Sequence, residues 1–218
     1  SLCKAAKEAG IDAVIAADTA VLMIAKEHGL GIHLSVQANI GNLEAVRFYA
    51  QFADVMVLAR ELRLSQIRKI CDGIRREKIA GPSGELVRIE VFVHGALCVA
   101  VSGKCYMSLA VFNSSANRGD CYQPCRRSYT VRDSVNGQEL AIDNHYVMSP
   151  NDLCTIDILP RILDAGVSVL KIEGRGRSAD YVAAVTQVYR EAVDAWKNGI
   201  VPEAGQLELW KKRLHEVF

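Results

Sequence analysis

The sequence predicts an α/β protein built as a TIM-like (β/α) barrel, truncated at its amino end, with a cysteine-rich insertion that contains a β-hairpin. Three observations support this prediction. Short apolar runs alternate with amphipathic helical segments, which is typical of a parallel sheet. Polar residues follow the ends of these runs, where such a barrel places its active site. No glycine-rich dinucleotide-binding loop follows any of the runs.

The apolar runs that we expect as strands cover residues 13–17, 32–36, 55–58, 89–93 and 167–172. A helical segment follows most of them. Asp18 precedes the first helix, Asn42 and Ser65 are the expected caps of the next two, and the last helix runs from about Ser178 to Asn198. Strands and helices that alternate at this spacing predict βα units in sequence order.

The expected domain spans residues 1–199, with residues 95–149 as the insertion. Five βα units are recognisable whereas a closed barrel needs eight, so we expect further strands upstream of Ser1. A doubly wound open sheet is the alternative. Residues 129–146, with Asn136-Gly137 at their centre, predict a hairpin. Residues 200–218 are expected to form a helical tail or to begin a further domain.

The composition limits the classes of function. The net charge of +1 gives no global field for a polyanion, so any nucleic-acid site has to be a local patch. No apolar run is long enough to span a membrane, and the opening residues resemble a helix and not a signal peptide. We therefore expect a cytoplasmic protein without a membrane partner.

Seven cysteines are an odd number for a disulfide framework, and a long, core-rich chain does not need one. Cys3 and Cys71 lie in helical segments and are expected to be small buried hydrophobes. The other five are Cys98, Cys105, Cys121, Cys125 and Cys154. Their spacing is not the two-residue spacing of a zinc ribbon. It leaves an iron–sulfur cluster and a four-cysteine zinc site equally open, with unliganded thiols as a third alternative.

The sequence around these cysteines resembles a known family. Residues 90–108, EVFVHGALCVAVSGKCYMS, meet every fixed position of the pattern E-x-F-x-x-G-A-x-C, four residues, G-x-C-x-M-S. That pattern is the signature of the collagenase-like peptidases of unassigned catalytic type, family U32. Residues 117–126 (NRGDCYQPCR), 149–154 (SPNDLC) and 170–175 (LKIEGR) extend the resemblance, which covers residues 10–199.

The resemblance implies an activity other than proteolysis. Several members resemble oxygen-independent hydroxylases that make 5-hydroxyuridine in tRNA or 5-hydroxycytidine in ribosomal RNA. These are implied to carry a 4Fe-4S cluster, and the RNA-modifying ones to depend on prephenate. By motif the ligands fall on Cys98, Cys105, Cys154 and Cys121, with Cys125 as the alternative to Cys121. Some relatives resemble heterodimers, which makes a paralogous subunit an expected partner beside tRNA or other RNA. A non-catalytic cluster or zinc protein that pairs with such a subunit is therefore an alternative function.

Polar residues at the predicted strand ends supply the remaining candidates. The candidate catalytic residues are Glu90, His94 and Glu173, and the candidate substrate contacts are Arg60, Glu61, Lys171 and Arg175. For each of them a packed or ion-paired structural role is the alternative. Glu90, for example, is expected to face the barrel interior and to pair with an arginine or with Lys171.

Arginines and aromatic residues alternate in the cysteine-rich segment. Arg118 and Arg126 are the candidate RNA contacts, with Arg127 and Arg132 beside them and Tyr122 and Tyr129 interleaved. Such a mixture suits phosphate binding and base stacking, and a solvated face is the alternative.

A peptidase has weaker support from the residues. The sequence contains no G-x-S-x-G elbow and no H-E-x-x-H helix. Ser102 and Ser108 flank the cysteines, but they are more simply explained as loop-capping residues.

Overall fold

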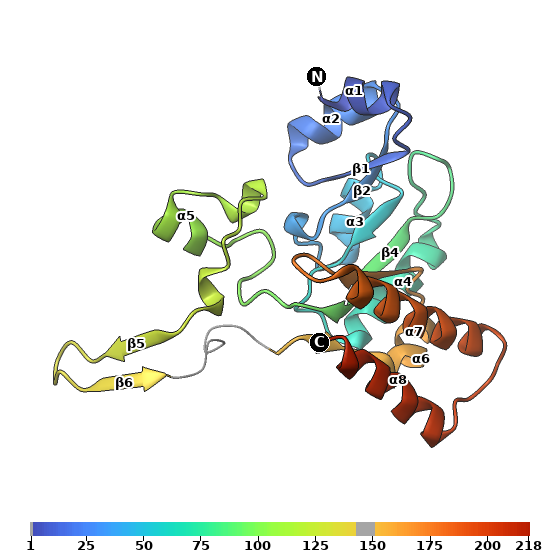
Figure 1. Cartoon of the computed structure of the whole chain (residues 1–218). Coiled ribbons are helices and arrows are strands. Elements are labelled where there is room, and N and C mark those ends of the chain that lie inside the picture. The colour runs from blue at the N-terminus through green and yellow to red at the C-terminus, as the bar shows by residue number, and fades with distance from the viewer. Residues whose placement is uncertain (1, 143–150) are drawn as a thin grey trace. The chain divides into compact units, whose positions relative to one another are not determined.

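The computed structural model describes residues 2–142 and 151–218, and these residues form two compact units (Figure 1). Unit 1 comprises residues 1–95 and 154–218, and unit 2 comprises residues 96–153. Within the described ranges, no helix is both long enough and apolar enough to cross a membrane.

Unit 1 is built on a curled, parallel sheet. Its strands are β1 (Ala13–Ala16), β2 (Gly31–Leu34), β3 (Val55–Val57), β4 (Arg88–Gly95) and β8 (Val169–Glu173). They lie in the order β1-β2-β3-β4-β8, and the short β7 (Leu153–Cys154), through which the chain re-enters this unit, also pairs with β4. Because the order follows the chain without a reversal, the sheet has barrel-type winding and lacks the switch point of a doubly wound sheet.

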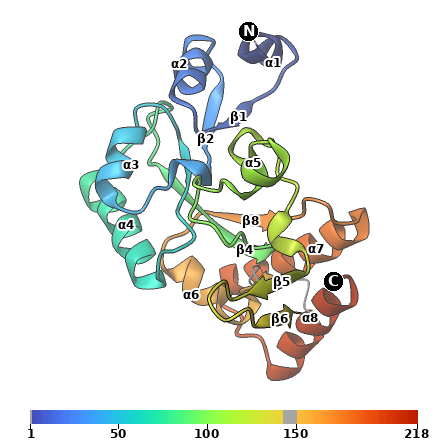
Figure 2. The same cartoon turned by 90° about the vertical axis from the view of Figure 1, so that its left-hand side faces the viewer.

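Helices follow the strands because each begins with a local cap or a break in the apolar run. Asp18 caps α2 (Thr19–Glu27), Asn42 caps α3 (Leu43–Tyr49) and Ser178 caps α7 (Ala179–Lys197), each by accepting backbone N–H groups. The remaining helices of unit 1 are α1 (Leu2–Glu8), α4 (Leu64–Glu77), α6 (Leu159–Asp164) and α8 (Ala204–Glu216). Figure 2 shows α3 and α4 at the left of the view and α6 and α7 at its lower centre and right.

The predicted cap of α4 is wrong by two residues. The helix begins at Leu64 with Arg63 in the cap position, so Ser65 lies inside its first turn. The side chain of Gln66 accepts the backbone N–H of Arg63 at 2.9 Å. This hydrogen bond satisfies the backbone N–H of Arg63, which has no partner within the helix, so a serine cap is not required.

The two faces of the sheet differ in chemistry. One face packs against the helices and belongs to the main core; its strand residues include Ala16, Leu34, Met56, Ile89, Val91 and Leu170. The opposite face, which we call the Glu90 face, carries Ile15, His33, Val57, Glu90, Phe92 and Lys171, as the register and the alternation along each strand require. Ile15 on this face is 64% exposed.

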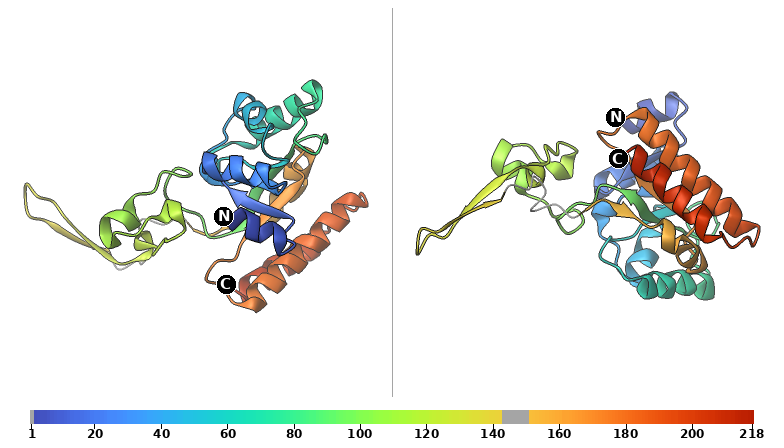
Figure 3. Two further views of the ribbon diagram at one scale, coloured as in Figure 1. Left: turned by 90° about the horizontal axis from the view of Figure 1, so that it is seen from above. Right: turned by 60° about the horizontal axis from the view of Figure 1, so that its bottom comes forward.

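The carboxyl-terminal helices lie together on unit 1. The right view of Figure 3 shows α7 and α8 running side by side. Trp210 on α8 is buried, and its indole N–H donates to Glu191 on α7 at 2.9 Å. Arg213 also contacts this carboxylate, and its hydrogen bond lowers the pKa of Glu191. The helix predicted for the tail is therefore present and packed on unit 1.

Unit 2 contains the helix α5 (Met107–Phe112), two 3-10 turns and a hairpin. The turns are η2 (Ala116–Arg118) and η3 (Pro124–Arg126). The strands β5 (Tyr129–Arg132) and β6 (Glu139–Ile142) pair in antiparallel register, as predicted for this stretch. The prediction extended to residue 146, and residues 143–146 lie outside the described residues, as do Ser149 and Pro150 of the SPNDLC segment.

Candidate functional site

The carboxyl ends of the parallel strands bring the predicted strand-end residues to one edge of the sheet. Arg60 and Glu61 follow β3, His94 is the penultimate residue of β4, and Glu173 and Arg175 end and follow β8. Because parallel strands end at the same edge, these residues share the location in which barrels and open α/β sheets bind ligands. This edge is the candidate functional site of unit 1.

Glu90 and Lys171 form an ion pair on the Glu90 face. Nζ of Lys171 lies 3.1 Å from Oε1 of Glu90, which confirms the predicted pairing. The Glu90 side chain is only 7% exposed and that of Lys171 is 25% exposed. The ammonium group also lies 5.6 Å from the centroid of the Phe92 ring. The pair therefore gives the buried carboxylate a cationic partner and leaves that cation partly accessible to an anionic ligand.

His94 belongs to a buried polar network behind the strand end. Its Nδ1 lies 3.4 Å from the hydroxyl of Tyr189 on α7. That hydroxyl donates to the carbonyl of Val93 at 2.8 Å and accepts the backbone N–H of Thr155 at 3.1 Å. Sequence reasoning singled out His94 but missed Tyr189, whose position among the buried residues of α7 predicts only a core role.

The same network reaches the predicted ligand Cys154. Burial raises the pKa of Tyr189 and the neighbouring Cys154 sulfur raises it further, against the opposing effect of the hydrogen bonds with Thr155. Tyr189 thus remains a protonated hydroxyl, and it donates its single proton to the Val93 carbonyl. The side chain of Thr155, next along the chain, also donates to the Val93 carbonyl at 2.9 Å. Residue 154 is thereby fixed to β4 while its own side chain is exposed.

Glu173 and Arg175 lie in a tight turn after β8. Oε1 of Glu173 accepts the backbone N–H of Arg175 at 2.7 Å, which orients the carboxylate toward its own loop. The backbone of Glu173 also closely approaches Gly95, whose φ is +101°. A Cβ at Gly95 would lie 2.1 Å from the Glu173 carbonyl oxygen, so only glycine fits there.

Four of the five candidate ligand cysteines lie in unit 2, and Cys154 lies in unit 1. All five are free thiols; Cys98 and Cys154 are exposed, and the other three are half-buried. Burial raises the pKa of Cys125, and the neighbouring charges of Cys98, Cys121 and Cys105 raise it further, against the opposing effect of Arg126. The four sulfurs of unit 2 are therefore electrostatic neighbours.

The chemistry of this donor set fits a cluster, because thiolates are the usual ligands of iron–sulfur centres as well as of structural zinc. Among residues 2–142 and 151–218, no three cysteine, histidine or carboxylate side chains are grouped as a metal site. The fit therefore rests on donor type, and the choice of ligands remains the prediction made from the sequence.

The arginines of unit 2 have different environments. Arg126 is half-buried and lies 3.5 Å from Asp152, and Arg132 on the hairpin lies 3.8 Å from Glu139. Arg118 is exposed. Arg127 places its guanidinium 4.6 Å from the centroid of the Phe112 ring, a contact that sequence reasoning missed.

Ser108 has a structural role. Its side chain is fully buried, and its hydroxyl accepts the backbone N–H of Tyr122 at 2.8 Å. This bond ties α5 to the segment that carries Cys121. The expected loop-capping role is therefore wrong for Ser108, because this residue lies inside α5 and binds a distant segment, although its role is structural.

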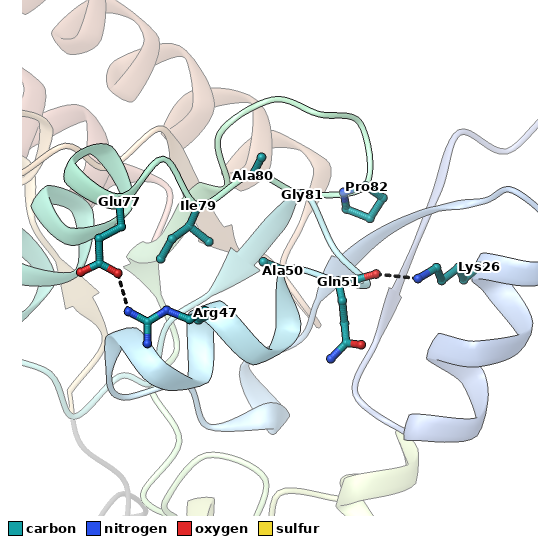
Figure 4. Close-up of a pocket in the computed structure, with 9 residues that line it drawn as sticks. All are labelled: Lys26, Arg47, Ala50, Gln51, Glu77, Ile79, Ala80, Gly81 and Pro82. Carbon is teal, nitrogen blue, oxygen red and sulfur yellow. Dashed lines mark hydrogen bonds and ion pairs between the residues drawn. The ribbon is translucent and has the colours of Figure 1, made fainter.

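A cavity of about 650 Å³ lies at the opposite end of unit 1 (Figure 4). It is lined from α2, α3, α4 and the loop before β4, near the amino ends of the strands. An ion pair between Arg47 and Glu77 crosses it, and Lys26 donates to the Gln51 carbonyl at 2.9 Å. These contacts join α2, α3 and α4, and none of the predicted site residues lines this cavity.

Comparison with known proteins gives a family and several relatives. The profile of peptidase family U32 matches residues 1–218. A protein of Porphyromonas gingivalis named "Collagenase" is 54% identical over the whole chain, which covers 52% of that relative. "tRNA hydroxylation protein P1" of Bacillus subtilis is 35% identical over 88% of the chain and 45% of its own length. "23S rRNA 5-hydroxycytidine C2501 synthase" of Escherichia coli is 38% identical over 92% of the chain and 28% of its own length.

The chain spans about half the length of the first of these relatives and less of the others. No solved structure matches it.

Proposed function

Because the chain belongs to peptidase family U32, we propose that it serves an RNA hydroxylase, with 5-hydroxylation of a tRNA uridine as the reaction. The observation that carries this proposal is the similarity to relatives named for hydroxylation of tRNA and of 23S rRNA, which extends over 88% and 92% of the chain. An enzyme that modifies a base has to take that base out of its stack, so the substrate is an unpaired or flipped nucleotide.

We further propose that Cys98, Cys105, Cys121 and Cys154 hold a 4Fe-4S cluster. Cys125 is the alternative to Cys121, and zinc is the alternative occupant of the same thiolates. When bound, the cluster would supply electron transfer or activation of a small oxygen donor. Free, accessible thiols support this assignment, because a ligand sulfur has to be reachable during cluster assembly.

The residues at the strand ends would bind the co-substrate. Prephenate, the proposed co-substrate, carries two carboxylates, and Lys171, Arg175 and Arg60 bring positive charge to this edge. Glu90 fixes the Lys171 ammonium in place, and Glu61 and Glu173 would orient a hydroxyl group of the substrate. The Tyr189 hydroxyl, 3.4 Å from Nδ1 of His94, would orient the imidazole ring at this edge.

The relatives are longer than this chain, so they could contain the further strands that would complete a barrel. The Glu90 face carries the exposed Ile15 beside charged groups, as the interior of an incompletely closed barrel would. We propose that further strands, supplied by the same polypeptide or by a paralogous subunit, cover this face. A cytoplasmic location fits a protein that works on tRNA with reduced thiols.

Nucleoside analysis tests the proposed reaction. RNA from a strain that lacks the gene should contain less 5-hydroxyuridine, or less 5-hydroxycytidine if ribosomal RNA is the substrate. The intact gene should restore it and a Cys98→Ala allele should not. A Cys3→Ala allele is the matched control, because Cys3 is buried in α1. Unchanged hydroxylated nucleosides in the deletion strain would contradict the proposal.

A peptidase is the second candidate function, because the relative that is 54% identical is named for collagen degradation. The buried Ser108 is already bound to the Tyr122 amide, so it does not offer a free nucleophile. Hydrolysis of gelatin by the purified protein should be absent. Hydrolysis that co-purifies with the protein and vanishes on a single substitution at the strand-end residues would support the peptidase instead.

A further inference from the structure

We propose that Phe112, Tyr122 and Arg127 form a stacking platform for an unpaired RNA base. This inference rests on the proposed RNA function and names the surface that would hold the substrate. The platform lies wholly within unit 2, on the end of α5 and the segments that flank η3. None of the three residues is a proposed cluster ligand.

Phe112 contacts both Tyr122 and Arg127, and all three side chains remain accessible. The rings of Phe112 and Tyr122 have their centroids 5.5 Å apart at an interplanar angle of 54°. Phe112 is 36% exposed and Tyr122 is 60% exposed. The guanidinium of Arg127 lies 4.6 Å from the Phe112 centroid. Aromatic rings with an arginine plane beside them are the elements that bind unpaired bases in single-stranded RNA.

The platform is held by the backbone around it. Phe112 is the last residue of α5, because Asn113 adopts a left-handed conformation with φ of +52°. The Tyr122 backbone N–H is bound to Ser108 on the same helix at 2.8 Å, which fixes the tyrosine beside Phe112. The hydroxyl of Tyr129 donates to the Pro124 carbonyl, so this neighbouring tyrosine has a structural role. Preorganised rings lose less entropy on binding than flexible ones.

Charge distinguishes Arg127 from its neighbour. Arg126 is paired with Asp152, whereas Arg127 makes no ion pair within residues 2–142 and 151–218. The guanidinium N–H groups of Arg127 that do not face the Phe112 ring are available to donate to a phosphate next to the stacked base. The platform thus offers a nucleotide both of the contacts it needs, a π surface and a cation.

Binding of a model RNA tests the platform. The full 218-residue chain would be titrated with an RNA stem-loop that carries a fluorescent purine analogue in the loop, and with a blunt duplex of equal length, at one salt concentration. Tyr122→Leu and Phe112→Leu keep apolar volume but remove the ring. Tyr122→Phe is a control that keeps the ring. Val135→Ala is a second control, which removes apolar surface from a residue of unit 2 that is 93% exposed and lies outside the platform.

The wild-type chain should prefer the stem-loop and quench the fluorescent base. Each leucine variant should raise the Kd about 5- to 100-fold and abolish the quench, because one stacked base contributes that much affinity. Tyr122→Phe and Val135→Ala should stay within about twofold of wild type. Unfolding midpoints in urea should be the same for all variants, which would exclude misfolding as the cause.

Three results would overturn the platform. Leucine variants that bind and quench like wild type would exclude these rings while leaving the proposed function intact, and would make a protein partner the better explanation of their exposure. Equal affinity for duplex and stem-loop would exclude base stacking. A wild-type chain that binds neither RNA would contradict the proposed RNA function as well.

Discussion

Removal of either partner of the Glu90–Lys171 ion pair should have unequal effects on stability. The Lys171→Met substitution keeps the length of the side chain but leaves the Glu90 carboxylate, 7% exposed, without its cation. An uncompensated buried charge costs about 3 kcal/mol. Glu90→Gln leaves an ammonium that is 25% exposed and able to turn to water, so its cost should be about 1 kcal/mol.

Urea unfolding followed by far-ultraviolet circular dichroism measures the difference, provided that the dependence on denaturant is the same for all variants. The double variant Glu90→Gln, Lys171→Met should be more stable than Lys171→Met alone, because it no longer buries a charge. Equal costs for the two single substitutions, or a neutral Lys171→Met, would refute the assignment of a desolvated carboxylate held by one lysine. Lys4→Met is the control, since its ion pair with Glu8 lies on the surface.

Three further predictions concern single residues of unit 1. Tyr189→Phe should lower the free energy of unfolding by about 1 kcal/mol, because Thr155 would still donate to the Val93 carbonyl after the tyrosine hydroxyl is lost. A much larger loss in urea unfolding would contradict this arrangement. Gly95→Ala should lower the free energy of unfolding by more than about 3 kcal/mol or prevent folding, because its Cβ would collide with the Glu173 carbonyl oxygen. A variant as stable as the wild type would show that β4 and β8 can separate at this point. Burial raises the pKa of Cys71 to about 11, so its thiol stays protonated below that pH. Mass spectrometry should find Cys71 unalkylated at pH 8 while the exposed Cys98 of the metal-free chain reacts, and the opposite order would be incompatible with the burial of Cys71.

The fold was predictable from the sequence to the extent that it depends on local pattern. Apolar runs marked the five strands of the parallel sheet, and Asp18, Asn42 and Ser178 marked the starts of three helices. Ser65 gave a wrong helix start, because a serine is compatible with the first turn of a helix as well as with the cap position. The short β7 was missed because two residues carry no periodicity.

The site was less predictable because its contacts are long-range. Tyr189 is 96 residues from Val93 in the sequence, and the residues around them do not form a pattern that predicts their hydrogen bond. The pairing of Glu90 with Lys171 was predictable, because both alternate within strands that were expected to meet. The interleaved arginines and tyrosines suggested base stacking, but only the fold of unit 2 brings Arg127 onto Phe112.

The metal content of the protein tests the central claim most directly. After purification without oxygen, the protein should contain about four iron atoms and four acid-labile sulfides per chain. Variants in which Cys98, Cys105, Cys121 or Cys154 is replaced by alanine should each lose them, and the Cys3→Ala control should not. One zinc per chain without sulfide would contradict the account, as would a full cluster in the Cys154→Ala variant.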